Sequence, residues 1–188
     1  MSEEYKVLVT GAAGLLGSHF CDHLLGKGHQ VIAIDNLSGG YRENIDKRVV
    51  LYTNDLCDAE AIDAIFERHS VDYVYHFAAY AAVGLSPFIR SFNYQNNILA
   101  SANLINSSIR HNIKKFIFAS SMDVYGSQIP PFTEDMKPEP QDPYGIAKYA
   151  VEMDLANAYR QFGLKYTIIR PHNIIGPKQK YDDPYRNV

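Results

Sequence analysis

Cysteine is scarce in this sequence of 188 residues, which contains only Cys21 and Cys57. The two lie far apart and in no paired motif, which excludes a disulfide framework and favours a reducing compartment, the cytoplasm. Residues 1–4 (Met-Ser-Glu-Glu) are acidic and lead straight into a strand-like run. A secretory signal peptide has the opposite charge at its start, so we expect none here.

Long apolar runs and a surplus of basic residues are missing as well. No run approaches the roughly 20 apolar residues of a membrane span, and Asp22, Lys27 and Asp35 interrupt the most apolar early region. Lys and Arg number 18 against 21 Asp and Glu, which gives a net charge of -3. Binding to nucleic acid requires a basic face. We therefore expect neither a membrane nor a nucleic acid as partner.

What the sequence does contain is a regular alternation of short apolar runs with longer segments of helical period. Runs such as Val-Leu-Val and Phe-Ile-Phe-Ala are apolar on both faces, as buried parallel strands are. The alternation predicts an α/β, doubly wound parallel sheet (the Rossmann fold), in which ligands bind at the carboxyl ends of the strands. The expected strands are residues 5–10, 30–35, 49–52, 71–77, 115–120 and 165–170, and the expected helices are residues 14–27, 59–69, 87–111 and 144–162.

A glycine-rich turn, Gly-Ala-Ala-Gly-Leu-Leu-Gly at residues 11–17, joins the first expected strand to the first expected helix. Gly11 permits the tight turn, Gly14 lets the backbone approach a pyrophosphate, and Gly17 allows the helix to pack close to the sheet. The helix N-terminus then offers free N–H groups and a partial positive charge to phosphates. This context favours dinucleotide binding over an ordinary turn. No Gly-Lys-Ser/Thr follows, which argues against a nucleoside-triphosphate P-loop.

Asp35 ends the second expected strand, about 20 residues after the glycine-rich turn, where a ribose-binding carboxylate is expected. A carboxylate there accepts hydrogen bonds from ribose hydroxyls and repels a 2′-phosphate, which favours NAD over NADP. The alternative is an Asp that starts a turn before Asn36 and Ser38. Position and residue type together favour the cofactor role.

Tyr144 and Lys148 lie one helical turn apart on one face of the last expected helix. A phenol titrates near pH 10, so it is a poor base at neutral pH. A nearby ammonium and a charged nicotinamide favour the phenolate and bring it into working range. The alternative is an incidental pair on an exposed helix, since the chain has 14 tyrosines. The glycine-rich turn upstream, and Ser120 and Ser121 at the end of the fifth strand, favour a catalytic group.

We expect no metal site on the first helix. His19 and His23 are spaced i, i+4, but position 20 is Phe, where a metalloprotease helix carries Glu. The same helix is already committed to phosphate binding by the glycine-rich turn before it.

Taken together, these motifs make the sequence resemble the extended short-chain dehydrogenase/reductases, especially the NAD-dependent nucleotide-sugar epimerases and dehydratases. The matching segments run over nearly the whole chain in the family's order. They are residues 11–17, 35–37 (Asp-Asn-Leu), 55–56 (Asp-Leu), 76–79 (His-Phe-Ala-Ala), 96–97 (Asn-Asn), 120–126 (Ser-Ser-Met-Asp-Val-Tyr-Gly), 144–148 (Tyr-Gly-Ile-Ala-Lys) and 170–173 (Arg-Pro-His-Asn).

The resemblance implies roles for individual residues. Tyr144 matches the base that takes the proton from a sugar hydroxyl, Lys148 the residue that holds the nicotinamide ribose, and Ser121 the catalytic Ser or Thr. Together with the glycine-rich turn, the resemblance predicts that NAD contacts Gly11, Gly14, Leu15, Leu16, Gly17, Asp35, Asn36, Ser38, Asp55, Leu56, Phe77, Ala78, Ala79, Asn96, Tyr144, Lys148 and Pro171. The implied substrate contacts are Ser121, Met122, Tyr144 and Asn173.

For the reaction, the resemblance implies epimerisation at carbon 4 of a nucleotide sugar of the UDP-glucose/UDP-galactose type, through a transient 4-keto sugar. A 4,6-dehydratase is the alternative, because Asp123 occupies the position of the family's carbon-5 base. Met122 cannot serve as the acid that expels the hydroxyl, and an epimerase needs neither group. An epimerase is therefore favoured.

The length of the chain departs from the family, whose members normally continue past residues 170–173 into a C-terminal lobe that grips the nucleotide. We expect an NAD-binding Rossmann domain over residues 1–175 and the start of a truncated substrate lobe over residues 176–188. A catalytically inactive cofactor-binding fragment is thus a third possibility. The helices at residues 87–111 and 144–162 resemble those that pair across a homodimer as a four-helix bundle.

Overall fold

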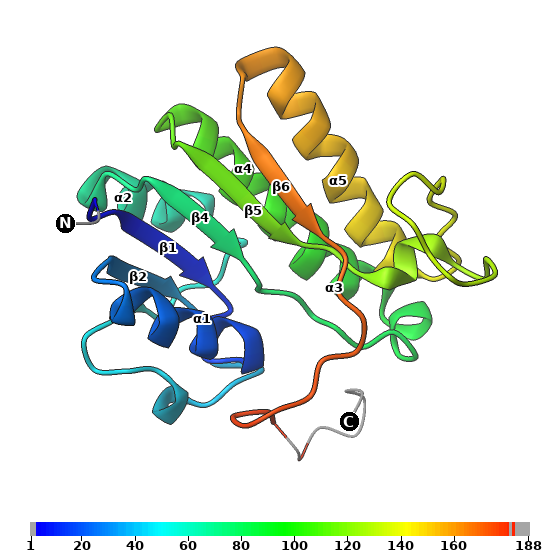
Figure 1. Cartoon of the computed structure of the whole chain (residues 1–188), viewed down its shortest axis with the longest axis horizontal. Helices are drawn as coiled ribbons and strands as arrows, with labels where there is room; N and C mark the ends of the chain where they lie inside the picture. Colours follow the sequence, from blue (N-terminus) through cyan, green and yellow to red (C-terminus); the bar gives the residue numbers. More distant parts are fainter. Residues whose placement is uncertain (1–2, 181, 183–188) are drawn as a thin grey trace.

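Six parallel strands form one sheet in the order β3-β2-β1-β4-β5-β6 in the computed structural model, which describes residues 3–180 and 182 (Figure 1). The chain order reverses between β1 and β4, and such a reversal is where ligands bind in open α/β sheets. The predicted doubly wound fold is confirmed. The strands are β1 (Lys6–Thr10), β2 (Gln30–Ile34), β3 (Val50–Tyr52), β4 (Tyr73–His76), β5 (Lys115–Ala119) and β6 (Tyr166–Ile169).

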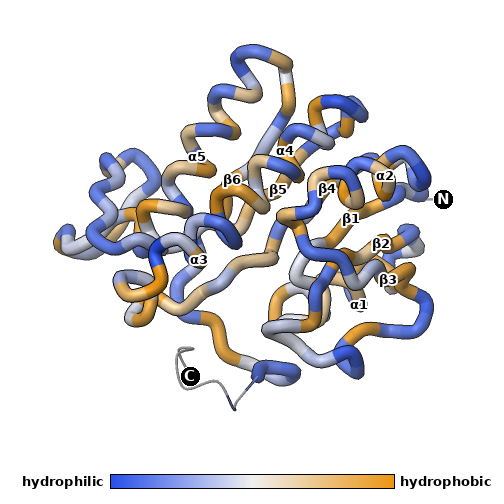
Figure 2. Tube along the Cα trace, turned by 180° about the vertical axis from the view of Figure 1, so that it is seen from behind, coloured by the Kyte–Doolittle hydropathy of each residue, from blue (hydrophilic) through white to orange (hydrophobic). Residues whose placement is uncertain are grey.

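Helices cover both faces of the sheet. Helices α2, α4 and α5 pack on one face and α1 packs on the other, which is the nearer face in Figure 1. Seen from behind in Figure 2, hydrophilic residues mark the outer turns of the helices that cover the far face. The helices are α1 (Leu15–Gly26), α2 (Ala59–His69), α3 (Arg90–Tyr94), α4 (Ala100–Arg110) and α5 (Pro143–Phe162), and the shorter turns are η1 (Arg42–Asn44), η2 (Ser86–Phe88) and η4 (Met122–Tyr125).

The strands are apolar on both sides because each side meets a packed layer. Leu8 of β1 belongs to the cluster formed with α2, α4 and α5, whereas its neighbours Val7 and Val9 belong to the cluster formed with α1. All three side chains are buried. This arrangement explains why the sequence of β1 shows no polar alternation.

The two long capped helices begin and end at residues with clear local signals. The Asp58 side chain accepts a hydrogen bond from Ala61 N at the start of α2, and Asp142 accepts from Tyr144 N and Gly145 N at the start of α5. Helix α5 ends at Gly163, whose φ of 74° is left-handed. A glycine takes this conformation without strain, so the chain can turn back into β6.

The prediction of one continuous helix over residues 87–111 is wrong. The structure divides it into η2, α3, a π-helical segment η3 (Gln95–Leu99) and α4. The wider π turn brings the Asn97 side chain onto the backbone of Tyr80, whose N–H donates to Asn97 Oδ1 at 2.9 Å and whose C=O accepts from Asn97 Nδ2 at 3.2 Å. Such π segments often mark functional sites. In the described part of the chain, no helix combines the length and apolarity needed to cross a membrane.

Candidate active site

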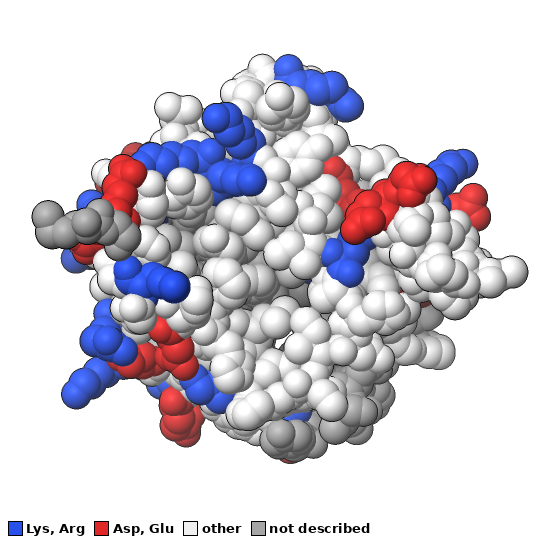
Figure 3. All heavy atoms as spheres, viewed as in Figure 1, with Lys and Arg blue, Asp and Glu red and all other residues white. Residues whose placement is uncertain are grey.

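A pocket of about 370 Å³ opens at the carboxyl ends of the strands, on both sides of the reversal between β1 and β4. In Figure 3 most charged side chains lie around the periphery of this face, although the pocket lining itself includes Asp35, Asp55, Asp123, Lys148 and Lys180. The structure brings every predicted site residue to this pocket. They are Gly11, Gly14, Leu15, Leu16, Gly17, Asp35, Asn36, Ser38, Asp55, Leu56, Phe77, Ala78, Ala79, Asn96, Ser121, Met122, Tyr144, Lys148, Pro171 and Asn173.

The glycine-rich turn has no room for side chains at two of its three glycines. A Cβ at Gly17 would lie 2.1 Å from the carbonyl oxygen of Gly11, and Gly11 itself has a φ of 69° and lies against the backbone of Ala78. Gly14 is the N-cap of α1, and no side chain caps this helix end. The uncapped N–H groups of α1 are therefore presented at the pocket, as an anion requires.

Asp35 holds the glycine-rich turn in place. Its Oδ2 accepts a hydrogen bond from Ala13 N at 2.8 Å, and its Oδ1 accepts from Leu37 N at 2.8 Å. Asn36, next in the chain, donates from Nδ2 to Asp55 Oδ2 at 3.3 Å. Each carboxylate oxygen can accept more than one hydrogen bond, so Asp35 retains acceptor capacity on the pocket side.

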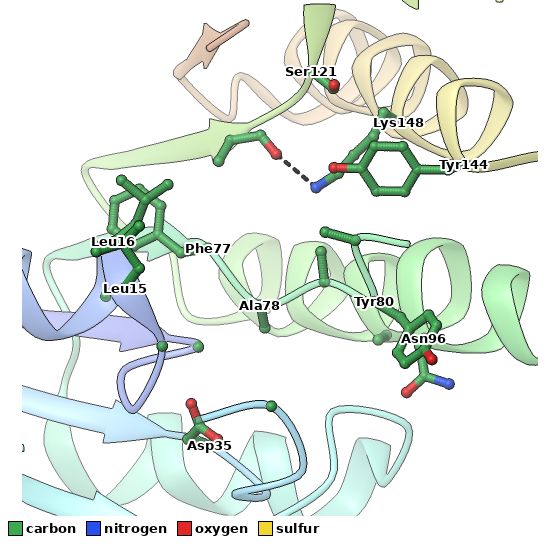
Figure 4. A pocket seen from close by; sticks show the side chains of 18 of the residues that line it. Leu15, Leu16, Asp35, Phe77, Ala78, Tyr80, Asn96, Ser121, Tyr144 and Lys148 are labelled. Carbon is green, nitrogen blue, oxygen red and sulfur yellow. Dashed lines mark hydrogen bonds between the residues drawn. The ribbon is translucent and has the colours of Figure 1, made fainter. Parts of the chain in front are cut away.

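Tyr144 and Lys148 project from α5 into the side of the pocket opposite Asp35 and the glycine-rich turn (Figure 4). Both are almost wholly buried. Lys148 Nζ donates to the carbonyl oxygen of Ala119 at 2.7 Å and lies 5.7 Å from the centre of the Tyr144 ring. The one-turn spacing seen in the sequence thus places both side chains at one site.

Burial controls the ionisation of both groups. It raises the pKa of Tyr144 well above its usual value, and the negative charge of Asp123 raises it further. Burial lowers the pKa of Lys148 to about 7, against a smaller opposing effect of Glu152. The protein's own groups therefore do not produce the lowered Tyr144 pKa that the sequence suggested, because burial and the charge of Asp123 outweigh the hydrogen bond of Ser121, which favours the phenolate.

Ser121 caps the η4 turn beside Tyr144. The Ser121 hydroxyl donates to Asp123 Oδ2 at 2.9 Å and accepts from Asp123 N at 3.1 Å. A Cβ at Gly145 would lie 2.8 Å from the carbonyl oxygen of Asp123, so α5 starts in direct contact with η4. This close packing fixes Ser121 relative to Tyr144.

A buried ion pair lies behind the Lys148 side of the pocket. Glu152, one turn after Lys148, accepts from Arg170 Nη2 at 2.6 Å and Arg170 Nε at 3.0 Å, and from the Ser120 hydroxyl at 2.5 Å. Arg170 also donates to the Tyr125 hydroxyl at 2.9 Å. The group ties together α5, η4 and the chain after β6, which all carry pocket residues.

A second polar connection runs through the core next to the pocket. The Ser101 hydroxyl donates to Asn97 O at 2.5 Å, so it accepts from His76 Nε2 at 2.9 Å. His76 Nδ1 then accepts from the Thr10 hydroxyl at 2.7 Å. Burial lowers the pKa of His76 to about 3, and the ring is neutral. This chain of bonds joins the end of β1 to α4.

The sequence analysis missed several residues of the pocket. Tyr80 and Phe92 both line it, and their rings meet edge to face at a centroid distance of 5.0 Å. Gln179 and Lys180 also line it, although they follow β6 by about ten residues. No local motif marks these four positions, since the folded chain and not the local sequence brings them to the pocket.

The described residues suit a dinucleotide. The glycine-rich turn gives close backbone access at the uncapped end of α1, and Asp35 offers an anion at the end of β2. The volume of about 370 Å³ lies in the range of small-molecule and cofactor sites.

Comparison with known proteins gives the same assignment. A UDP-glucose 4-epimerase of Halalkalibacterium halodurans is 37% identical over 171 residues, which cover 90% of this chain and 51% of that protein. The crystal structure of the Thermotoga maritima UDP-glucose 4-epimerase with UDP-glucose superposes with a TM-score of 0.93 at 40% identity, over 96% of this chain and 59% of that one. The Thermus thermophilus UDP-glucose 4-epimerase complex with NAD gives a TM-score of 0.91 at 34% identity, over 96% and 58%.

The chain spans about half the length of the curated relatives it matches. The sequence profile of the NAD-dependent epimerase/dehydratase family matches residues 7–188. The resemblance drawn from the motifs is therefore confirmed, and NAD is the cofactor of the family. This chain belongs to the NAD-dependent epimerase/dehydratase family.

Proposed function

We propose that this chain is the cofactor-binding part of a nucleotide-sugar 4-epimerase, with residues 1–175 as its NAD-binding domain and residues 176–188 as the start of a substrate lobe. The observation that carries the proposal is one pocket lined by the glycine-rich turn, Asp35, Ser121, Tyr144 and Lys148. The sugar class rests on the UDP-glucose 4-epimerases that the chain resembles.

The glycine-rich turn and the N-terminus of α1 would hold the pyrophosphate of NAD, and Asp35 and Asp55 the adenosine end. Phe77, Ala78 and Pro171 would line the path toward the nicotinamide end. When bound, NAD would supply a reversible acceptor for the hydride of sugar carbon 4. Since Asp35 repels a 2′-phosphate, calorimetry should show tighter binding of NAD than of NADP, and equal affinities would contradict this role.

Tyr144 would take the proton from the sugar hydroxyl, with its oxygen beside the Ser121 hydroxyl. A cation in this part of the pocket favours the phenolate, which burial and Asp123 oppose. The bond to Ala119 O holds the Lys148 side chain beside Tyr144. Lys148 could contact a ribose hydroxyl there, and its positive charge would favour the phenolate. Ser121 would orient the same sugar oxygen.

A 4,6-dehydratase is the second candidate, and one observation favours it. Asp123 lines the pocket, and burial raises the pKa of its carboxyl, so it is placed to exchange a proton there. Met122 offers no proton to a leaving hydroxyl, which keeps the epimerase as the first choice. The two reactions differ in product, because only a dehydratase yields a 4-keto-6-deoxy sugar.

We also propose that the protein works as a cytoplasmic homodimer. Helices α4 and α5 pack against each other, and large apolar side chains are exposed on α5 and on the segment before α4, namely Met153, Tyr159, Phe162, Phe92 and Leu99. Such a surface suits a second copy of the same helices. Sedimentation of the purified chain tests this, and a monomer at micromolar concentration would contradict it.

Mass spectrometry of the purified protein for bound NAD, followed by incubation with UDP-glucose and with UDP-N-acetylglucosamine, tests the function. We expect bound NAD, and any 4-epimer that this chain forms should be lost in Tyr144→Phe with cofactor binding nearly unchanged. A 4-keto-6-deoxy product would replace the epimerase by the dehydratase. Bound NAD without any sugar conversion would leave a cofactor-binding protein only.

A further inference from the structure

The segment at residues 173–180, here called the strap, leaves the end of β6 and crosses to the half of the sheet that carries α1 (Figure 1). Its Gly176 lies over the glycine-rich turn, since a Cβ there would be 3.6 Å from Leu15 Cδ1. Gln179 and Lys180 of the strap line the pocket, and Gln179 is buried. The strap therefore forms part of the wall beside the start of α1.

Asn44 attaches the strap to the glycine-rich turn. Its side-chain Nδ2 donates to Ala13 O at 2.8 Å and to Lys178 O at 3.1 Å, so the two N–H groups of one amide hold the two segments together. Lys178 Nζ returns a bond to Asn44 O at 3.1 Å. Asn44 and Lys178 thus make reciprocal bonds across 134 residues of sequence.

Further contacts hold the strap to α1. Lys178 Nζ lies 2.6 Å from Asp22 Oδ2, and the His19 ring contacts Pro177 O at 3.0 Å. Lys178 has a φ of 69°, in the left-handed region that residues other than glycine seldom adopt. Such a conformation persists where surrounding contacts impose it. These contacts account for Lys178 holding this backbone shape.

We propose that Asn44 and Lys178 are positioning residues that keep the strap closed beside the bound dinucleotide and so set how slowly it leaves. The proposal rests on NAD binding in this pocket, as in the proposed function. Neither residue lines the pocket. Removing either side chain should open the strap. Because Asn44 also holds Ala13 O of the glycine-rich turn, Lys178→Ala is the variant whose effect on cofactor release isolates the strap.

Stopped-flow fluorescence tests the proposal with NADH preloaded on the full chain and chased by excess NAD. We expect Asn44→Ala and Lys178→Ala each to raise the dissociation rate about tenfold, in line with the loss of one or two partly exposed hydrogen bonds. Association should stay the same or become faster, because an open strap does not obstruct entry. The double variant should release NADH little faster than either single variant, since both hold one contact.

Asn106→Ala is the matched control, because Asn106 is exposed on α4 and away from the pocket. Salt gives a second readout: it screens the exposed Lys178–Asp22 pair, so it should speed release from the wild-type protein more than from Lys178→Ala. Wild-type binding with unchanged release in both variants would overturn the strap proposal alone. Failure of the wild-type chain to bind NADH would instead overturn the proposed function.

Discussion

The hydroxyl of Ser121 donates to the carboxylate of Asp123 at 2.9 Å, and Ser121 Oγ in turn accepts from the backbone N–H of Asp123 at 3.1 Å. The single hydroxyl proton of Ser121 is therefore directed at Asp123. The carboxylate also lies near enough to Tyr144 to raise the pKa of the phenol beyond the effect of burial. Asp123 thus acts on two of the predicted catalytic residues at once.

Asp123→Asn should lower the pKa of Tyr144, because an amide of the same shape removes the negative charge that opposes the phenolate. The measurement is NMR of protein labelled with ¹³C-tyrosine, with Tyr144→Phe to identify the resonance. Asp46→Asn serves as the control, since Asp46 does not line the pocket. An unchanged or higher Tyr144 midpoint in Asp123→Asn would show that the carboxylate does not act on the phenol.

Lys148 should make the protein more stable as the pH rises from 7 to 9. Its folded pKa of about 7 lies below the 10.5 of an exposed lysine, so in this range the unfolded chain holds a proton that the folded protein has released. Stability rises wherever the unfolded state binds more protons. Over two pH units this amounts to about 2 kcal/mol for one group.

Urea denaturation of Lys148→Met and of the wild-type protein at pH 7 and pH 9 measures this contribution of Lys148 to the free energy of unfolding. The free energy of unfolding should increase with pH by about 2 kcal/mol less in the variant. Parallel pH dependences in the two proteins would mean that Lys148 keeps an ordinary pKa in the fold.

Gly17→Ala should destabilise the protein and weaken NAD binding. The new Cβ would lie 2.1 Å from the carbonyl oxygen of Gly11, and only a shift of the turn or of α1 can relieve that contact. We expect a loss of about 2 kcal/mol or more, the size of an overpacked core substitution. Gly26→Ala in the same helix is the control, because a Cβ there meets nothing within 4 Å. Equal stability of the two variants would contradict the close packing of the turn.

Glu152→Ala should lower the free energy of unfolding by about 3 kcal/mol, because it leaves the largely buried Arg170 without its counter-charge. Arg48→Ala provides the comparison, because the Arg48–Asp46 pair lies at the surface and its loss should change the free energy of unfolding much less. Denaturant titration of both variants measures the difference. Similar small losses would mean that the Glu152–Arg170 pair adds no more than a surface pair does.

Local patterns predicted the strands, the glycine-rich turn, Asp35 and the Tyr144–Lys148 pair. Each of these features depends on neighbours within one strand–turn–helix unit, so residue spacing is enough to identify it. The other predicted pocket residues came from the resemblance to the family. The ends of several strands fall one or two residues inside the expected limits, as for β4 at Tyr73–His76. End residues fray because they lack a partner on one side.

The sequence could not predict features that depend on distant partners. The π segment at Gln95–Leu99 has an ordinary helical pattern, and what distinguishes it is the contact of Asn97 with Tyr80. The strap depends on Asn44 and Lys178, which are brought together only by the folded sheet. The raised pKa of Tyr144 depends on how deeply α5 is buried, which spacing does not reveal.

The neutral imidazole of His76 has a mechanical consequence for the pocket. The ring donates from Nε2 to Ser101 of α4 and accepts at Nδ1 from Thr10 of β1. One tautomer of His76 therefore links the β1 side of the cavity to the α4 side. Separating the two walls there would break the hydrogen bonds that join Thr10, His76 and Ser101. Each buried group left without a partner would cost about 1–3 kcal/mol. The rim beside α1 is held by partly exposed contacts, such as the Lys178–Asp22 pair, which water can replace. The cavity is therefore expected to widen at its rim while its floor stays rigid.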